Sequence, residues 1–338
     1  CRMAGHRLGA AGMFVRPGMP APPAAAWPPS FPHLYLRGFV AGLHEARDLW
    51  RALRKRGGEG GAREFPSRDA LRSIATDLCG ALFPMRLGPP DLHVEGEDFY
   101  VGHTLDRALT GLLAQVRLEL AYQARHDETL APQVDERAAG IVRSFAAGLP
   151  ALRTLLDADV IAAFEGDPAA RSVDEVLLCY PGVLAVIHHR LAHALYELGV
   201  PLVARILAEL AHSDTGIDIH PGAQIGAGFF IDHGTGVVIG ETAVIGQRVR
   251  LYQAVTLGAR RFDVDSDGHL AKGGARHPIV EDDVVIYAGA TVLGRITIGR
   301  GSSIGGNVWL TRSVPPGSNV TQAGLHHERL EGRDGANI

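Results

Sequence analysis

Residues 217–258 read IDIHPGAQIGAGFFIDHGTGVVIGETAVIGQRVRLYQAVTLG, and an aliphatic residue returns at nearly every sixth position of this stretch. The series is Ile219, Ile225, Ile231, Ile239, Ile245, Leu251 and Leu257, followed after a gap by Val280, Ile286, Val292, Ile298, Ile304 and Leu310. A period of six fits neither an alternating strand nor the 3.6-residue turn of an α-helix. It is typical of a parallel β-helix, in which short strands meet at sharp corners and three hexapeptides close one triangular coil. The sequence therefore predicts a β-helix over residues 214–318.

The region before this β-helix has the periodicity of α-helices. Between about Ser67 and His212, apolar residues recur at a spacing close to 3.6, without strand-like alternation. Ser67 is placed as the N-cap of the first helix, and Pro150 and Asp157 are expected to lie near helix boundaries. We expect an all-helical domain over residues 61–213.

The two ends of the chain and its composition narrow the class of protein. Residues 1–60 are predicted as a leader that is partly disordered, with a transit peptide or a mis-assigned start left open, and residues 319–338 as a flexible tail. The net charge of -4 gives no bias toward nucleic acid or membrane surfaces, and no apolar run is long enough for a membrane helix. We expect a cytoplasmic protein with neither kind of partner.

The six-residue period is interrupted in the segment FIDHGTG, residues 230–236, where two extra residues bulge from a coil. Asp218 precedes His233 by about one coil, so the two side chains can approach each other across adjacent rungs. A His beside a carboxylate suits general-base catalysis, because the carboxylate fixes the ring tautomer and stabilises the cation that forms. The alternative, a corner histidine whose partners are backbone groups, stays open.

A second interruption, residues 258–279, contains Arg276 and His277. A guanidinium group binds a carboxylate through two parallel hydrogen bonds, so Arg276 is the candidate anion site, with a solvated surface arginine as the alternative. One expected helix carries three histidines, His188, His189 and His193. They lack the Glu motif of a helical metal site, so helix packing or a subunit contact is the expectation for them.

Taken together, these residues make the chain resemble the serine acetyltransferase family. The resemblance is carried by Asp218–Gly226, Ile231–Ala243, Val255–Gly258 and Arg276–Pro278, and it extends back to Asp167–Pro168 over about half of the chain. It implies an α+β protein, in which an N-terminal all-helical domain precedes a left-handed parallel β-helix of hexapeptide repeats. It also implies a serine O-acetyltransferase, which transfers acetyl from acetyl-CoA to L-serine and yields O-acetylserine and CoA for cysteine biosynthesis.

The resemblance implies roles for four residues around the reacting hydroxyl. His233 is expected to be the general base that takes the serine proton, with Asp218 as its dyad partner. Asp167 and Asp232 are expected to bind the serine amine. Because Asp167 belongs to the helical domain, the substrate would lie where that domain meets the β-helix of an adjacent subunit.

Further roles concern the substrate carboxylate and the co-substrate. By the same resemblance, Arg276 would bind the carboxylate of serine, with His277 beside it. Acetyl-CoA would lie along the groove between coils, where Ala288 and Gly306 are candidates for backbone contacts and Ala259 is a further one. No metal is expected.

The resemblance also implies partners. Flat β-helix faces commonly pack into trimers, so a homotrimer or a dimer of trimers is expected. Members of the family often end in an Ile whose carboxylate enters O-acetylserine sulfhydrylase, a recognised mode of capture, and this chain ends in Ile338. The loop 259–275 is longer and more acidic than in short members of the family.

Three rival functions stay open beside this one. The first is another hexapeptide acyltransferase that acts on a different hydroxyl or amine. The second is a β-helical zinc carbonic anhydrase, which uses three histidines across a trimer interface, a set that His233 beside Asp232 does not reproduce. The third is a non-catalytic scaffold that docks a sulfhydrylase.

Overall fold

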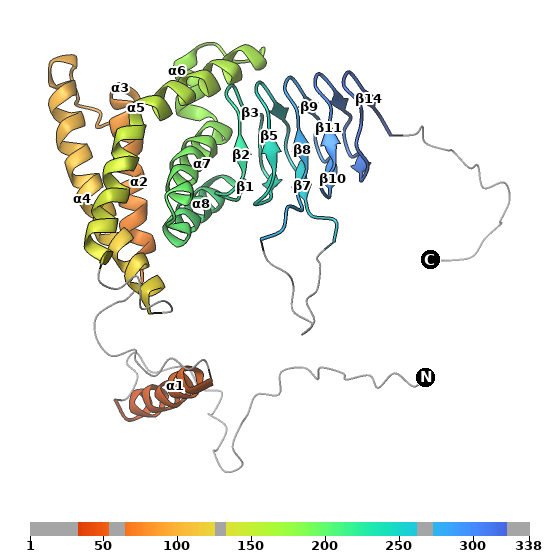
Figure 1. The fold of residues 1–338 in the computed structure, drawn as a ribbon. Helices are drawn as coiled ribbons and strands as arrows, with labels where there is room; N and C mark the ends of the chain where they lie inside the picture. Colours follow the sequence, from red (N-terminus) through yellow and green to blue (C-terminus); the bar gives the residue numbers. More distant parts are fainter. Residues whose placement is uncertain (1–32, 54–64, 126–132, 262–272, 323–338) are drawn as a thin grey trace, which may run out of the picture. The chain divides into compact units, whose positions relative to one another are not determined.

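The computed structural model describes residues 33–53, 65–125, 133–261 and 273–322 (Figure 1). Its helices are α1 (His33–Leu53), α2 (Arg68–Leu82), α3 (Pro84–Leu87), the 3-10 helix η1 (Val94–Gly96), α4 (Glu97–Ala124), α5 (Val134–Gly166), α6 (Val173–Cys179), α7 (Pro181–Glu197) and α8 (Pro201–Thr215). The chain forms two compact units, residues 1–62 and residues 63–338. The first contains α1, which lies within the segment predicted as a leader, and the second contains every other described element.

The strands follow the helices as short parallel pieces. They are β1 (Asp218–Ile219), β2 (Gln224–Ile225), β3 (Phe230–Ile231), β4 (Val238–Ile239), β5 (Val244–Ile245), β6 (Arg250–Leu251), β7 (Thr256–Gly258), β8 (Ile279–Val280), β9 (Val285–Ile286), β10 (Thr291–Leu293), β11 (Thr297–Ile298), β12 (Ser303–Ile304), β13 (Trp309–Leu310) and β14 (Asn319–Val320). The predicted order, helices first and hexapeptide strands second, is confirmed.

The helices of the second unit pack around a continuous apolar core, in which α7 and α8 lie next to the β-helix (Figure 1). The helix α2 begins as the sequence predicted, since the Ser67 hydroxyl accepts a hydrogen bond from the amide of Ala70 at 3.4 Å. The N-terminus of α8 is capped from a neighbouring helix, because the buried carboxylate of Glu119 accepts bonds from the amides of Leu202 and Val203 at 2.8 and 2.7 Å. None of the described helices combines the length and the apolarity needed to cross a membrane.

The expected helix boundaries near Pro150 and Asp157 are wrong, because α5 runs without interruption through both residues. Proline removes one backbone donor from the helix, which leaves the carbonyl four residues earlier without its usual bond. Pro150 lies on the exposed side of α5, where water can solvate this carbonyl. The buried apolar stripe on one face of α5 continues on both sides of Pro150, with Leu149 before it and Leu156 after it. Burial of this stripe therefore outweighs the local cost of the proline.

The strands form a triangular prism with three parallel sheets (Figure 1). Sheet A has the order β1-β4-β7-β10-β13, sheet B the order β11-β8-β5-β2, and sheet C the order β14-β12-β9-β6-β3. Partners on neighbouring rungs are 18 residues apart where the hexapeptides are regular, as for Thr291 and Trp309. Across the bulge at residues 232–236 they are 20 apart, as for Asp218 and Val238. The predicted two-residue insertion is thus absorbed at one corner without shifting the aliphatic column.

The chain passes from sheet A to B, then to C, and back to A, so the prism has three edges, called here the A–B, B–C and C–A edges. The aliphatic residues of the six-residue series point inward and are buried, except Ile225 and Leu310, which are partly buried. The corners require a left-handed backbone, which even non-glycine residues adopt here, including Arg248 and Asp283 on the B–C edge. A repeating corner geometry therefore underlies each edge.

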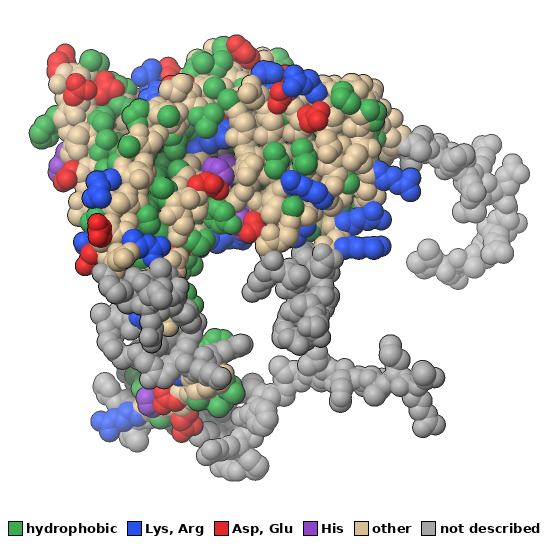
Figure 2. All heavy atoms as spheres, viewed as in Figure 1, with side chains coloured by type: hydrophobic (Ala, Val, Ile, Leu, Met, Phe, Trp, Pro, Cys, Tyr) green, Lys and Arg blue, Asp and Glu red, His purple; other side chains and the backbone are tan. Residues whose placement is uncertain are grey.

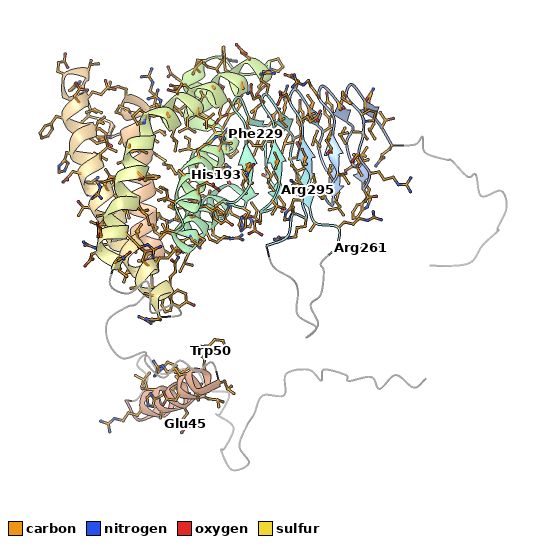
Figure 3. The ribbon with its side chains drawn as sticks, viewed as in Figure 1. Glu45, Trp50, His193, Phe229, Arg261 and Arg295 are labelled. Carbon is orange, nitrogen blue, oxygen red and sulfur yellow. The ribbon has the colours of Figure 1, made fainter. Side chains whose placement is uncertain are left out.

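A buried ion pair joins the helical part to the first coil of the prism. The guanidinium of Arg190 in α7 contacts both carboxylate oxygens of Asp159 in α5 at 3.1 Å, and each side chain is only 4% exposed. Arg190 also donates to the backbone carbonyls of Ile225 and Gly226. Asp159 accepts a bond from the amide of Phe229 at 2.8 Å, at the junction labelled in Figure 3. Two helices and the first rung are thereby held in one arrangement.

Candidate active site

His233 lies in the bulge on the C–A edge, between β3 and β4. Its backbone has a φ of 58°, and its side chain is 70% exposed. The next residue, Gly234, has a φ of 84°, and a Cβ there would lie 2.4 Å from the side chain of Ile217, so only glycine fits. This tight turn leaves the imidazole of His233 on the surface, where a substrate can reach it.

A carboxylate lies directly beside this imidazole. The Oδ1 atom of Asp232 is 3.9 Å from Nε2 of His233, and the Asp232 side chain is only 11% exposed. Its other oxygen, Oδ2, is 3.3 Å from the guanidinium of Arg250 on the next rung. Arg250 is held in turn over the rings of Phe230 and Tyr252, with centroid distances of 5.1 and 4.9 Å. Asp232 is therefore held in place, and Arg250 balances part of its negative charge through one of the two carboxylate oxygens.

A second carboxylate comes from the helical part. Asp167 ends α5, and its side chain accepts hydrogen bonds from the hydroxyl of Tyr180 at 2.5 Å and from the amide of Ala169 at 2.8 Å. These bonds lower the pKa of Asp167, as do the positive charges of Arg250 and His233 nearby. The same hydrogen bond raises the pKa of Tyr180 to about 12. The structure thus brings Asp167, Asp232 and His233 together within one chain, whereas the sequence analysis expected the helical domain to meet the β-helix of an adjacent subunit.

Arg276 and His277 lie on the A–B edge, before β8. The ring of His277 is buried against Gly240, where any Cβ would come within 2.0 Å of it. Its Nδ1 accepts a hydrogen bond from the amide of Thr242 at 3.0 Å, so the neutral ring carries its proton on Nε2. Burial and the charge of Arg276 lower the pKa of His277 to about 4, so the ring is neutral at physiological pH and can donate a hydrogen bond.

The guanidinium of Arg276 is half-buried and partly engaged. It contacts the carboxylate of Glu241 at 2.6 Å and donates to the carbonyl of Gly274 at 3.2 Å. Arg295, one rung further, donates to the carbonyls of Thr242 and His277 (Figure 3). Basic side chains gather on this side of the prism in Figure 2, which makes the A–B edge a place for an anionic group.

One chain does not bring these two sets of residues together. Sheet A separates the C–A edge, with His233, from the A–B edge, with Arg276. Among the residues that the structure describes, no hydrogen bond or ion pair joins Arg276 or His277 to Asp167, Asp232 or His233. The single prism therefore carries two partial sites on two of its edges.

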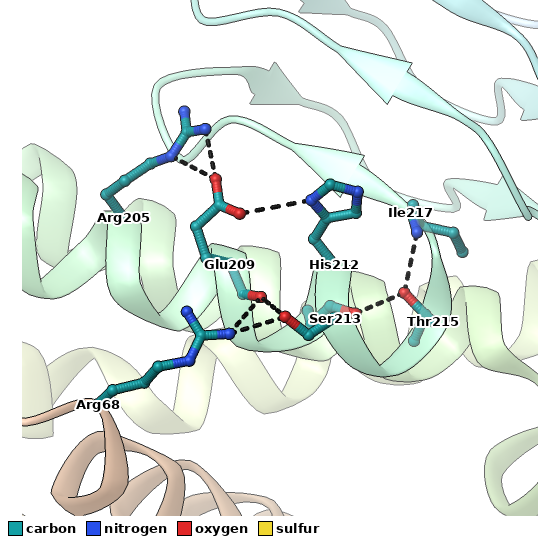
Figure 4. A network of polar contacts seen from close by, with 8 residues as sticks. Arg68, Arg205, Glu209, His212, Ser213, Thr215 and Ile217 are labelled. Atoms are coloured by element: carbon teal, nitrogen blue, oxygen red, sulfur yellow. Dashed lines mark hydrogen bonds and ion pairs between the residues drawn. The ribbon is translucent and has the colours of Figure 1, made fainter. Parts of the chain in front are cut away.

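Asp218 lies in β1 with neighbours that the sequence did not predict. Its carboxylate is within 4.8 Å of ligand atoms of Glu209 and His212, which lie in the last two turns of α8. Glu209 contacts Arg205 at 2.5 Å and lies 3.4 Å from Nδ1 of His212 (Figure 4). Glu209, His212 and Asp218 could hold a metal ion by their donor types, although Arg205 already neutralises Glu209. Within the described parts of the chain, Asp218 makes no ion pair with His233, so its role as dyad partner stays a prediction.

The candidates for co-substrate contacts divide between the same two edges. Ala288 and Gly306 lie on the C–A edge above His233, where the amide of Asn307 donates to the carbonyl of Ala288 at 2.9 Å. Gly306 is exposed, and a Cβ there would crowd this carbonyl at 3.2 Å. Ala259 follows β7 and lies on the A–B edge. Most of the acidic loop that follows, residues 262–272, is outside the described residues.

Several residues of the site escaped the sequence reasoning. Arg250 pairs with Phe230, 20 residues earlier because the bulge intervenes, and only this shifted register could have placed it beside Asp232. Glu241 occupies the corner one rung before Arg276, but the long loop between them hides that relation. Tyr180 and Tyr196 come from the helical part and follow no hexapeptide period. Their contacts depend on how the helices pack against the prism.

Comparisons with known proteins agree with this architecture. Residues 277–312 match the family described as bacterial transferase hexapeptide (six repeats). The chain is 57% identical over 274 residues to a Synechococcus elongatus protein named "Serine acetyltransferase, plasmid", covering 80% of this chain and 86% of the relative. It is 53% identical over 167 residues to the serine acetyltransferase of Mycobacterium tuberculosis, covering 49% and 69%. The crystal structure of serine acetyltransferase isoform 3 from Entamoeba histolytica, in complex with cysteine, superposes with a TM-score of 0.63 at 36% identity, covering 77% and 84%.

Proposed function

Because the chain belongs to the serine acetyltransferase family, we propose that it takes its acetyl group from acetyl-CoA and uses His233 as the general base. The predicted fold, a helical domain followed by a left-handed parallel β-helix, is confirmed, and so is the enzyme class, an acyltransferase that acetylates serine. The observation that carries the proposal for His233 is its position, an exposed imidazole on a prism edge beside the carboxylates of Asp167 and Asp232.

The reaction needs one proton transfer in each direction. The serine oxygen forms a bond to the thioester carbon as its proton passes to the imidazole of His233. The tetrahedral oxyanion then collapses, the carbon–sulfur bond breaks, and the imidazolium returns the proton to the CoA thiolate. The exposed ring leaves room for both substrates to approach it.

Two carboxylates fit the ammonium group of serine. The bonds from Tyr180 and Ala169 lower the pKa of Asp167, so this side chain is an anion at neutral pH. Asp232 lies beside the imidazole and is kept in place by Arg250. The relative from Entamoeba histolytica was solved with cysteine, which has the same amine and carboxylate as serine. This likeness supports an amino-acid substrate held by both of its charged groups.

The carboxylate of serine would be bound by Arg276 and by Nε2–H of His277. These residues lie on the A–B edge, whereas His233 lies on the C–A edge. A second copy of the chain that places its A–B edge against this C–A edge would complete the site. Repeating that contact around a threefold axis closes a ring, so we propose a homotrimer, alone or as a dimer of trimers.

Acetyl-CoA would lie along the same seam between copies. Ala288 and Gly306, which carry a small side chain and none, lie on the C–A edge in line with His233. Ala259 on the A–B edge would approach it from the neighbouring copy. This arrangement brings the thioester to the imidazole and leaves the larger part of the co-substrate on the outer rungs.

A cytoplasmic location and docking to O-acetylserine sulfhydrylase stay predictions. Ile338, which would enter the sulfhydrylase, lies outside the described residues. The docking is tested by adding the ten-residue peptide that ends in Ile338 to the sulfhydrylase, with an Ile338→Ala peptide as the control. If only the peptide that ends in Ile338 competes with the full chain for the sulfhydrylase, the result supports docking through Ile338. Equal binding of both peptides would contradict docking through Ile338.

The reaction itself is tested by following thiol release from acetyl-CoA with and without L-serine, for the wild type and for His233→Ala. Serine-dependent release that falls by about 100-fold or more in the variant supports both the reaction and the base. Far-UV circular dichroism of the variant controls for folding. The absence of serine-dependent release from folded wild-type protein would contradict the proposal.

A further inference from the structure

We propose that Glu241 and Tyr196 are positioning residues that orient the guanidinium of Arg276 toward the carboxylate of the amino-acid substrate. The proposal rests on the proposed function, in which Arg276 binds that carboxylate. Neither residue has to touch substrate for this role. Both act through Arg276, whose long and flexible side chain otherwise has many conformations.

The central contact is a chain of two hydrogen bonds. Oε2 of Glu241 accepts a bond from Nη2 of Arg276 at 2.6 Å, and Oε1 accepts one from the hydroxyl of Tyr196 at 3.2 Å. Nη1 of Arg276 also donates to the carbonyl of Gly274. A guanidinium has five N–H donors, so these two bonds leave three for a bound carboxylate. The group is thereby held from one side and open on the other.

The backbone of Arg276 is fixed independently of Glu241. The hydroxyl of Thr242 accepts hydrogen bonds from the amides of both Arg276 and His277, at 2.9 and 3.1 Å. The amide of Thr242 donates in turn to the ring of His277. What remains to be ordered is the Arg276 side chain, and the carboxylate of Glu241 is the group within ion-pair distance of it among the described residues.

Tyr196 connects this arrangement to the helical part. It belongs to α7, which reaches the A–B edge, where Nδ1 of His193 is 2.8 Å from the carbonyl of Pro221. The ring of Tyr196 packs edge-on against His220, with a centroid distance of 5.8 Å. Figure 3 labels His193 at this junction, and Figure 2 shows histidine and acidic side chains reaching the surface between the helices and the prism. The hydroxyl that holds Glu241 therefore comes from a firmly packed helix.

The charge states suit this role. Partial burial opposes ionisation of Glu241, but the bond from Arg276 and the charges of His220 and Arg276 lower its pKa below the ordinary value. Burial and the neighbouring Glu241 raise the pKa of Tyr196, so its hydroxyl keeps its proton. Tyr196→Phe removes one bond of the chain and leaves both charges of the Glu241–Arg276 pair in place. It therefore separates an effect of orientation from an effect of charge.

The experiment compares L-serine with L-serinamide, which has the same hydroxyl and amine but no carboxylate, in assays of thiol release from acetyl-CoA. For Glu241→Ala and Tyr196→Phe we expect the KM for L-serine to rise, by about tenfold for the former and about threefold for the latter, with kcat and the KM for acetyl-CoA nearly unchanged. The kcat/KM for L-serinamide should stay constant. Glu241→Gln, which can still accept a bond from Arg276, should restore most of the loss.

The control variant is Asp283→Asn on the B–C edge. It weakens an ion pair of the same type, Arg248 with Asp283 at 2.6 Å between successive rungs, far from either candidate site. It should leave both substrates unaffected. If Glu241→Ala lowers kcat/KM for both substrates equally, or leaves both unchanged, the positioning role is wrong. If Arg276→Ala fails to lower the preference for L-serine over L-serinamide, the carboxylate-binding role of Arg276 in the proposed function fails instead.

Discussion

Replacement of Arg190 by Met is expected to destabilise the unit of residues 63–338 strongly. The Met side chain fills the space of the apolar stem but removes the guanidinium that contacts both oxygens of Asp159 at 3.1 Å. The carboxylate, whose side chain is 4% exposed, would keep only backbone amides as partners, such as that of Phe229. The carbonyls of Ile225 and Gly226 would lose their donor. The variant thus leaves an uncompensated charge at the junction of the helices with the first coil.

The size of the effect follows from this burial. Breaking one partner out of a buried ion pair costs about 3–5 kcal/mol, because the remaining charge stays desolvated. Changing Asp159 to Asn in the Arg190→Met background removes that charge and keeps an acceptor for Phe229. We expect this second change to recover about 1–3 kcal/mol. The exposed pair Arg248–Asp283 serves as the control, since Asp283→Asn should cost less than about 1 kcal/mol.

The assay is urea unfolding followed by far-UV circular dichroism at constant pH and protein concentration. With a slope of about 3 kcal/mol per molar urea, Arg190→Met should lower the unfolding midpoint by about 1 M or more. The double variant should unfold at a higher urea concentration than the single one. A free energy of unfolding for Arg190→Met within about 1 kcal/mol of the wild type would refute the view that this pair fastens the junction.

Three further predictions concern the candidate site. Asp218→Asn should lower kcat about tenfold or more with little change in the KM for serine, because a dyad carboxylate orients the imidazole; an unchanged kcat would leave Asp232 as the partner of His233. Asp167→Asn should raise the KM for serine about 10- to 100-fold by removing the charge opposite its ammonium, and an equal rise in the KM for acetyl-CoA would contradict this role. Because burial lowers the pKa of His277 from 6.5 to about 4, the unfolded chain takes up this proton first. Urea titrations should therefore show that the wild type loses stability relative to His277→Asn as pH falls through this range, whereas parallel curves would argue against a neutral buried ring.

The β-helix could be predicted in detail because each inward-facing residue recurs at a fixed spacing. The two-residue offset after Ile231 even located the bulge, which the structure shows as a change of register from 18 to 20 residues. The helix boundaries of the helical half could be predicted less well. The boundary expected near Pro150 is absent, because the lost backbone bond faces solvent and the apolar stripe continues beneath it. At Pro150, burial of the apolar stripe in the tertiary structure outweighs the low helix propensity of proline, and α5 continues.

The candidate site was predicted to the extent that it depends on neighbouring rungs. His233 and Asp232 are neighbours in the bulge as expected, but Asp167 joins them from the same chain and not across a subunit contact, because the end of α5 packs at the first coil. The contact of Tyr196 with Glu241 joins two domains, and no local pattern in the sequence records it. The same holds for Asp218, whose neighbours come from the end of α8. These contacts depend on how the helices pack against the prism, which the structure shows and the sequence pattern does not.

The central claim is that each complete site takes His233 from one copy of the chain and Arg276 from another, and mixing two inactive variants tests it most directly. His233→Ala and Arg276→Ala are unfolded together in equal amounts, refolded as a mixture and assayed for serine-dependent thiol release. With random mixing in closed rings, about a quarter of the sites would combine an intact His233 with an intact Arg276, so about a quarter of wild-type activity should return. A mixture no more active than the two variants alone, although mixed oligomers have formed, would contradict the claim.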